Sequence, residues 1–164
     1  MNARRILIPL DGSKIAEAAI PEAVEMARGV PCTFVLLRVA HARILPGADV
    51  VGDWVEAVHE AEEYLATLKK ELVAEGIGPI ETRVWQGAAA PAIIDAARRH
   101  HAELIVMTSH GRSGISRLVF GSVAEAVLRG SRVPILLIRP TGAPVAPPAE
   151  GERKPVEAFF RSAP

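Results

Sequence analysis

Five short apolar runs recur along the chain, and each is separated from the next by a segment with helical periodicity. A continuous apolar run that ends in turn residues is typical of a parallel strand buried on both faces. The runs span residues 6–8, 32–39, 80–85, 104–107 and 133–138. The helical segments span about residues 14–28, 53–75, 87–101 and 123–129. This alternation predicts a doubly wound α/β domain, in which helices cover both faces of a five-stranded parallel sheet.

Length and charge limit what such a domain binds. The chain has 164 residues, which fits one domain. Its 19 Lys and Arg residues balance 19 Asp and Glu residues, so the net charge is zero. A neutral chain has no overall positive field to hold nucleic acid or anionic lipid, and we expect neither nucleic acid nor membrane as a partner. No apolar stretch approaches the roughly 18 residues of a membrane span.

The lone Cys32 and the C-terminal stretch complete this outline. A single cysteine excludes an internal disulfide and favours a reducing compartment, so we expect a cytoplasmic protein. Residues 141–164 contain five prolines and lack sustained periodicity. Such a stretch buries too little apolar surface to order itself. We therefore predict a domain over residues 1–140, followed by a disordered tail.

Two loops at the ends of predicted strands have unusual compositions. Residues 9–13 read Pro-Leu-Asp-Gly-Ser, and residues 108–114 read Thr-Ser-His-Gly-Arg-Ser-Gly. In open parallel sheets, ligands bind beyond the carboxyl ends of the strands, where the strand order reverses. With the strand order 3-2-1-4-5, the first and fourth strands are neighbours. Both loops then flank one crevice.

The last helix opens at Gly121 and Ser122. Ser122, followed three residues later by Glu125, fits a capping box with Ser122 as the cap. A helix N-terminus favours phosphate through its free amides and its dipole. Gly111 and Gly121 allow close approach of backbone to an anion, and Arg112 could neutralise it. A capped helix beside a loop without any ligand accounts for the same pattern, so both interpretations stay open.

These residues also carry a family resemblance. Residues 105–114, followed by Gly121 and Ser122, resemble the universal stress protein family. Its nucleotide-binding members carry a glycine, two residues, a second glycine, nine residues and then Gly-Ser or Gly-Thr. The likeness extends over about residues 4–139 and includes residues 6–13, 36–39 and 134–138. It implies a Rossmann-like fold of the adenine nucleotide α-hydrolase type.

One position departs from the family motif. Thr108 stands where the first glycine is found, at the junction of the fourth strand and its loop. Its branched side chain there either crowds a nucleotide or offers its hydroxyl as a substitute hydrogen-bond donor. Gly111 and Gly121 keep the phosphate end of the motif.

The resemblance implies a bound ATP. Mg²⁺ could accompany it, held mainly through the phosphates, and we assign no metal ligand to the protein. The first four residues of the implied set would lie at the adenine and ribose, Met107 and Thr108 at the base–ribose side, and the rest around the phosphates. The set is Pro9, Leu10, Asp11, Val39, Met107, Thr108, Ser109, His110, Gly111, Arg112, Ser113, Gly121, Ser122 and Val123. Two of these residues have an alternative interpretation without a ligand. Asp11 could be an ordinary turn residue, and His110 could be a solvated loop histidine.

Three functions follow as hypotheses. The first is an ATP-binding stress-response module that acts through conformation or partners. The second is a slow ATP hydrolase, in which Asp11 or His110 orients a water molecule. We assign no catalytic residue, because no paired carboxylates stand beside the loop, and we expect at most weak ATPase activity. The third is a dimeric scaffold that binds no nucleotide.

Homodimerisation is expected through residues 133–138. They would form an apolar edge strand, and exposed edges of that kind are normally paired or covered. The resembling family commonly dimerises at this strand.

Overall fold

The computed structural model describes residues 4–41, 49–109 and 121–139, and the predicted tail lies outside this part of the chain. Five parallel strands form one sheet in the order β3-β2-β1-β4-β5. They are β1 Arg4–Leu10, β2 Cys32–Ala40, β3 Ile80–Gln86, β4 Leu104–Thr108 and β5 Ile135–Ile138. The predicted fold class and strand order are confirmed. Among the described helices, none has the length and apolar character needed to cross a bilayer.

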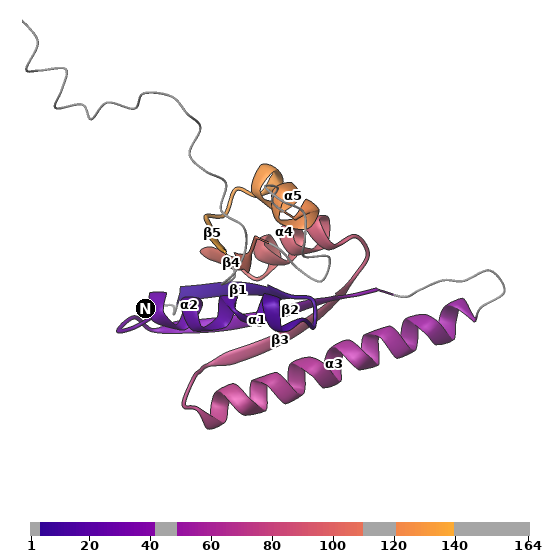
Figure 1. The fold of residues 1–164 in the computed structure, drawn as a ribbon, viewed down its shortest axis with the longest axis horizontal. Helices are drawn as coiled ribbons and strands as arrows, with labels where there is room; N and C mark the ends of the chain where they lie inside the picture. The colour runs from indigo at the N-terminus through magenta and orange to yellow at the C-terminus, as the bar shows by residue number, and fades with distance from the viewer. Residues whose placement is uncertain (1–3, 42–48, 110–120, 140–164) are drawn as a thin grey trace, which may run out of the picture.

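Helices cover both faces of this sheet (Figure 1). One face packs against α1 Lys14–Glu17, α2 Ala19–Met26 and α3 Val50–Ala74, and the other against α4 Ala89–Arg99 and α5 Ser122–Gly130. Successive strand residues point to opposite faces. Ile6 and Ile8 therefore join the core under α2 and α3, whereas Leu7 joins the core under α4 and α5. This two-sided burial explains why the β1 sequence is a continuous apolar run.

The predicted helix over residues 14–28 is interrupted near its start. Helix α1 ends at Glu17 and helix α2 begins at Ala19. Pro21 has no amide hydrogen, and its ring crowds the carbonyl four residues earlier, which is that of Glu17. The single proline therefore divides the segment into two helices.

Two helix starts differ from the prediction. Helix α3 is capped by Asp49, whose carboxylate accepts a hydrogen bond from the Gly52 amide at 3.1 Å; Asp53 lies in the first turn instead of capping. In α5 the N-cap is Gly121, and Ser122 is the first helical residue, without a side-chain cap bond among the described residues. The capping box at Ser122 was thus a wrong prediction. The Gly121 carbonyl accepts the Glu125 amide at 2.9 Å, so the helical hydrogen bonds begin one residue earlier.

Candidate functional site

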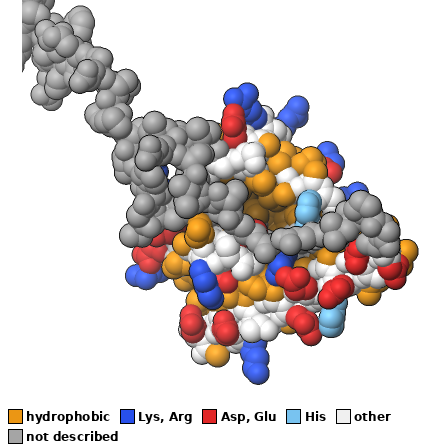
Figure 2. Space-filling model, turned by 45° about the vertical axis from the view of Figure 1, so that its right-hand side comes forward, with side chains coloured by type: hydrophobic (Ala, Val, Ile, Leu, Met, Phe, Trp, Pro, Cys, Tyr) orange, Lys and Arg blue, Asp and Glu red, His pale blue; other side chains and the backbone are white. Residues whose placement is uncertain are grey.

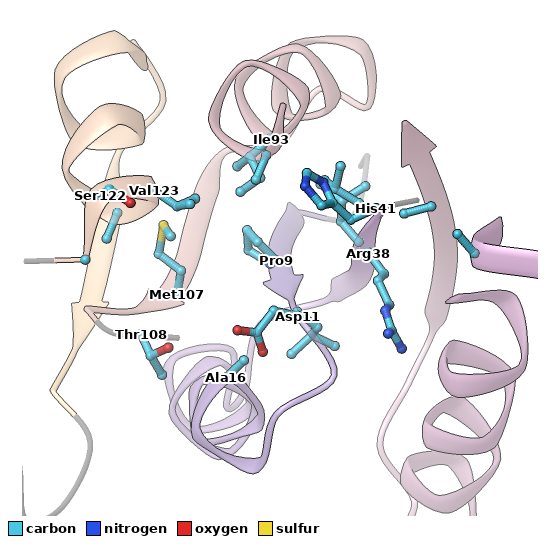
Figure 3. A pocket seen from close by; sticks show the side chains of 18 of the residues that line it. Pro9, Asp11, Ala16, Arg38, His41, Ile93, Met107, Thr108, Ser122 and Val123 are labelled. Atoms are coloured by element: carbon cyan, nitrogen blue, oxygen red, sulfur yellow. The ribbon is translucent and has the colours of Figure 1, made fainter. Parts of the chain in front are cut away.

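A cavity of about 670 Å³ lies at the carboxyl ends of β1, β2 and β4. The first turn of α5 and the N-terminal half of α3 form two of its other walls (Figure 3). Its volume falls within the roughly 300–1,000 Å³ that is typical of small-molecule sites. The position agrees with the rule that open parallel sheets bind ligands where the strand order reverses, because β1 lies between β2 and β4.

Ten of the sequence-predicted residues line this cavity, and they come from four separate segments of the chain. They are Pro9, Leu10, Asp11, Val39, Met107, Thr108, Ser109, Gly121, Ser122 and Val123. The other four, His110, Gly111, Arg112 and Ser113, lie outside the described residues. The structure thus brings the ten together, and their part in holding a nucleotide stays a prediction.

The loop of residues 11–13 forms one side of the cavity. Gly12 has a φ of +85°, a value that glycine adopts without strain. The Ser13 amide and hydroxyl both donate to Asp11 Oδ1, at 2.9 Å and 2.6 Å. The Ser13 hydroxyl also accepts the Ala16 amide at 3.2 Å, which caps α1. Asp11 is therefore an oriented carboxylate as well as a turn residue.

The end of β4 and the start of α5 form the opposite side. The Ser109 amide donates to the Ile138 carbonyl at 2.8 Å, and the Ser109 carbonyl accepts the Gly121 amide at 2.7 Å. These bonds connect the start of α5 directly to the end of β4. Ser122 and Val123 are exposed at the cavity wall. The positive end of the α5 dipole therefore lies at the cavity, where it favours an anion.

Several lining residues were missed by the sequence reasoning, and Arg38 is foremost among them. Its side chain is 10% exposed, and its Nη2 donates to Glu60 Oε1 at 2.8 Å. Arg38 is the one charged residue in the mostly apolar strand β2, a signal that could have marked it. Asp53 and Glu56 of α3 also line the cavity. Their spacing with Glu60 places the three carboxylates on one helix face.

The charges of the described lining residues are mostly negative. The lining includes one guanidinium, that of Arg38, and four carboxylates, which belong to Asp11, Asp53, Glu56 and Glu60. Figure 2 shows an apolar hollow beside a histidine, with acidic side chains gathered below it, on the side where α3 lies. An anion is therefore favoured at the α5 end of the cavity and disfavoured along α3. Among the described residues, no cluster of three or more His, Cys, Asp or Glu side chains is arranged to hold a metal ion.

Comparisons with known proteins point to one family. The sequence model of the universal stress protein family matches residues 2–139 of this chain. The universal stress protein MJ0531 of Methanocaldococcus jannaschii is 30% identical over 141 residues, which cover 83% of this chain and 82% of that protein.

Solved structures share the fold. The universal stress protein UspA of Lactobacillus plantarum is 26% identical with a TM-score of 0.71, covering 84% of this chain and 100% of that one. A universal stress protein family protein of Arabidopsis thaliana, solved with AMP bound, is 15% identical with a TM-score of 0.62, covering 85% of this chain and 93% of that one. The chain studied here belongs to the universal stress protein family.

Proposed function

We propose that this protein binds an adenine nucleotide, ATP in particular, in the cavity at the carboxyl ends of the strands, and that it acts as a nucleotide-dependent module of a stress response. One observation carries the proposal: residues from four separate segments, each implied by the family resemblance, line the same cavity. The cavity is also of suitable size for a small ligand. The AMP bound to the Arabidopsis thaliana protein, which shares the fold, belongs to the same ligand class.

The charges of the cavity favour one orientation of the nucleotide. In the proposed orientation the phosphates approach the start of α5, where Gly121 and Ser122 present the positive end of the helix. The base lies toward the apolar side chains of Val39 and Met107, and the ribose toward Asp11. The opposite orientation would bring the phosphates against the carboxylates of α3. In this proposal Mg²⁺ is carried by the phosphates, since phosphate oxygens are hard ligands of the kind it prefers.

Titration calorimetry with ATP and Mg²⁺ tests the proposal, after any co-purified nucleotide has been removed and identified. Wild type is expected to bind, and Gly121→Val is expected to lose binding because the added side chain stands at the start of α5. Ala126→Val is the matched control, because it places the same side chain at an exposed position of the same helix outside the cavity lining. It is expected to bind like wild type.

Two other outcomes decide against the proposal. Equal binding by wild type and Gly121→Val would place the ligand elsewhere. Absence of binding in wild type, with no nucleotide recovered from the purified protein, would favour a scaffold without a ligand.

Steady phosphate release by wild type would add slow hydrolysis to binding. Loss of that release in His110→Ala would assign the hydrolase role to the loop that contains His110.

The proposal includes a homodimer formed through β5 and a cytoplasmic location. Strand β5 lies at the end of the sheet, and its residues Ile135–Ile138 are apolar and only half-buried. Pairing with a second copy would satisfy the outer backbone edge and cover these side chains. The single Cys32, buried and free, supports a reducing compartment.

A further inference from the structure

Arg38 carries a buried charge at the border between the cavity and α3. Its side chain is 10% exposed, and it projects from β2 past the loop that carries Asp11 (Figure 3). Its Nη2 donates to Glu60 Oε1 at 2.8 Å, and its Cζ lies 4.7 Å from the centre of the Tyr64 ring. A carboxylate and an aromatic ring, both on α3, thus stabilise this guanidinium out of bulk water.

The same guanidinium lies directly against the loop of residues 11–13. A β-carbon placed on Gly12 would stand 3.1 Å from Cζ, Nη1 and Nη2 of Arg38 alike. Three equal distances mean that the flat side of the guanidinium faces the position that a β-carbon on Gly12 would take. The planar guanidinium therefore occupies the space beside Gly12, in contact with the loop.

A second contact connects α3 to α1, the helix that follows this loop. The Tyr64 hydroxyl donates to Glu17 Oε1 at 3.0 Å, in the helix α1 that the loop begins. Burial, followed by the negative charge of Glu17, raises the pKa of the Tyr64 phenol, so the hydroxyl stays a donor. Arg38 and Tyr64 together connect the loop and α1 to α3.

We propose that Arg38 is a positioning residue. It holds the loop of residues 11–13 in the position that lets Asp11 contact the ribose of a bound adenine nucleotide. This inference rests on the proposed function of the cavity. Arg38 acts through Gly12 rather than on the phosphates, because its charge is directed to Glu60 and Tyr64. Lysine cannot take its place, since a tetrahedral ammonium offers no flat face to Gly12.

Nucleotide affinity gives the first test. Arg38→Ala and Arg38→Lys are each expected to weaken AMP and ATP by the same factor, about tenfold, as is common for residues that hold a binding group in place. Gly121→Val is expected to weaken ATP more than AMP, because it acts at the phosphate end. Arg83→Ala is the control: it removes another glutamate-paired arginine, on the neighbouring strand and outside the cavity lining.

A double-mutant cycle gives the second test. Gly12→Ala is expected to weaken AMP binding in wild type and to weaken it less in Arg38→Ala, because the clash is then removed. Gly76→Ala is the matched control, with a φ of +80° but open space around the added carbon in the described structure. Additive effects of Gly12→Ala and Arg38→Ala, or wild-type AMP affinity in both Arg38 variants, would overturn the proposal.

Hydrogen exchange separates failure of this inference from failure of the proposed function. If wild type binds neither AMP nor ATP, the function proposed for the cavity fails. The positioning role is then decided in the ligand-free protein by exchange of the Ser13 amide, which is bonded to Asp11. Arg38→Ala is expected to speed this exchange several-fold relative to Arg83→Ala. Equal exchange in the two variants would overturn the positioning role.

Discussion

Ser13 donates two hydrogen bonds to a single carboxylate oxygen of Asp11, from its amide at 2.9 Å and from its hydroxyl at 2.6 Å. The same hydroxyl accepts the Ala16 amide and caps α1. The Ser13 side chain therefore contributes both to the orientation of the cavity carboxylate and to the start of the helix. A change at Ser13 should affect both.

Ser13→Ala is expected to lower the free energy of unfolding by about 1 kcal/mol, the usual effect of losing an N-cap side chain. It should also weaken nucleotide binding, because Asp11 loses the hydrogen bond from the Ser13 hydroxyl. Urea denaturation and titration calorimetry measure the two effects. Ser13→Thr keeps a hydroxyl at the cap and should retain most of both. Unchanged stability in Ser13→Ala would contradict the capping role.

Thr108 occupies the first glycine position of the family motif, and the structure shows how much of it reaches the cavity. The residue is 6% exposed, so little of its side chain projects into the open space. Thr108→Ser removes the methyl group and keeps the hydroxyl. We expect its ATP affinity to equal that of wild type. A gain of about tenfold, the scale of one methyl group in a tight pocket, would show that Thr108 crowds the ligand.

We expect His100 to make the stability of the fold depend on pH. It ends α4, and its ring meets Trp85 edge-on with 6.4 Å between centres. Burial lowers its pKa, and Arg83 and Arg5 lower it further against the opposing effect of Glu81. The unfolded chain therefore takes up a proton at higher pH than the folded one. The free energy of unfolding should fall as the pH decreases from the ordinary histidine pKa of 6.5 to the lower folded value.

Urea denaturation at about pH 7.5 and about pH 5.5 checks this dependence. Wild type should lose stability between the two, and His100→Gln should lose less. The lowered pKa of Glu81, which is caused mainly by its bond to Arg5, acts below that carboxyl's usual 4.5 and outside this range. An equal loss in wild type and variant would show that His100 is not responsible.

The outer edge of β5 offers a test of the proposed dimer. The carbonyls of Pro134 and Ile138 accept hydrogen bonds from the amides of Ile105 and Ser109, so both residues direct their backbone groups toward β4. Because successive residues of a strand direct these groups to opposite sides, the Leu137 amide points away from β4. Leu137→Pro should remove this outward donor without breaking the β4–β5 ladder. Leu137→Ala loses the same side-chain packing and keeps the amide. In sedimentation, wild type and Leu137→Ala should be dimers and Leu137→Pro a monomer.

A monomeric wild type at micromolar concentration would contradict the dimer outright. Dimers in all three proteins would place the interface elsewhere. Circular dichroism of each variant establishes that it is folded before its mass is interpreted.

The positions of the strands and of the loops that border the cavity could be predicted from sequence because their signals are local. The run Ile6–Leu7–Ile8 is buried on both faces, and a strand of that kind has a recognisable composition. The loops that follow β1 and β4 contain polar and glycine residues of the kind that line ligand sites. Adjacent strands then bring these loops together.

Other features depend on contacts between distant segments. Gly121 and Ser122 are both acceptable caps, and the bond from the Gly121 amide to the Ser109 carbonyl accompanies the earlier start of α5. The contact of Arg38 with Gly12 lies beside α3, which supplies Glu60 as the partner of the same guanidinium. A single sequence contains neither relationship in its local pattern.

A crystal structure of the nucleotide-stripped protein grown with ATP and Mg²⁺ tests the central claim most directly. The account predicts a nucleotide with its ribose at Asp11, its base beside Val39, and its phosphates at Gly121 and Ser122. An empty cavity under saturating ATP, or a nucleotide whose phosphates lie along the carboxylates of α3, would contradict it.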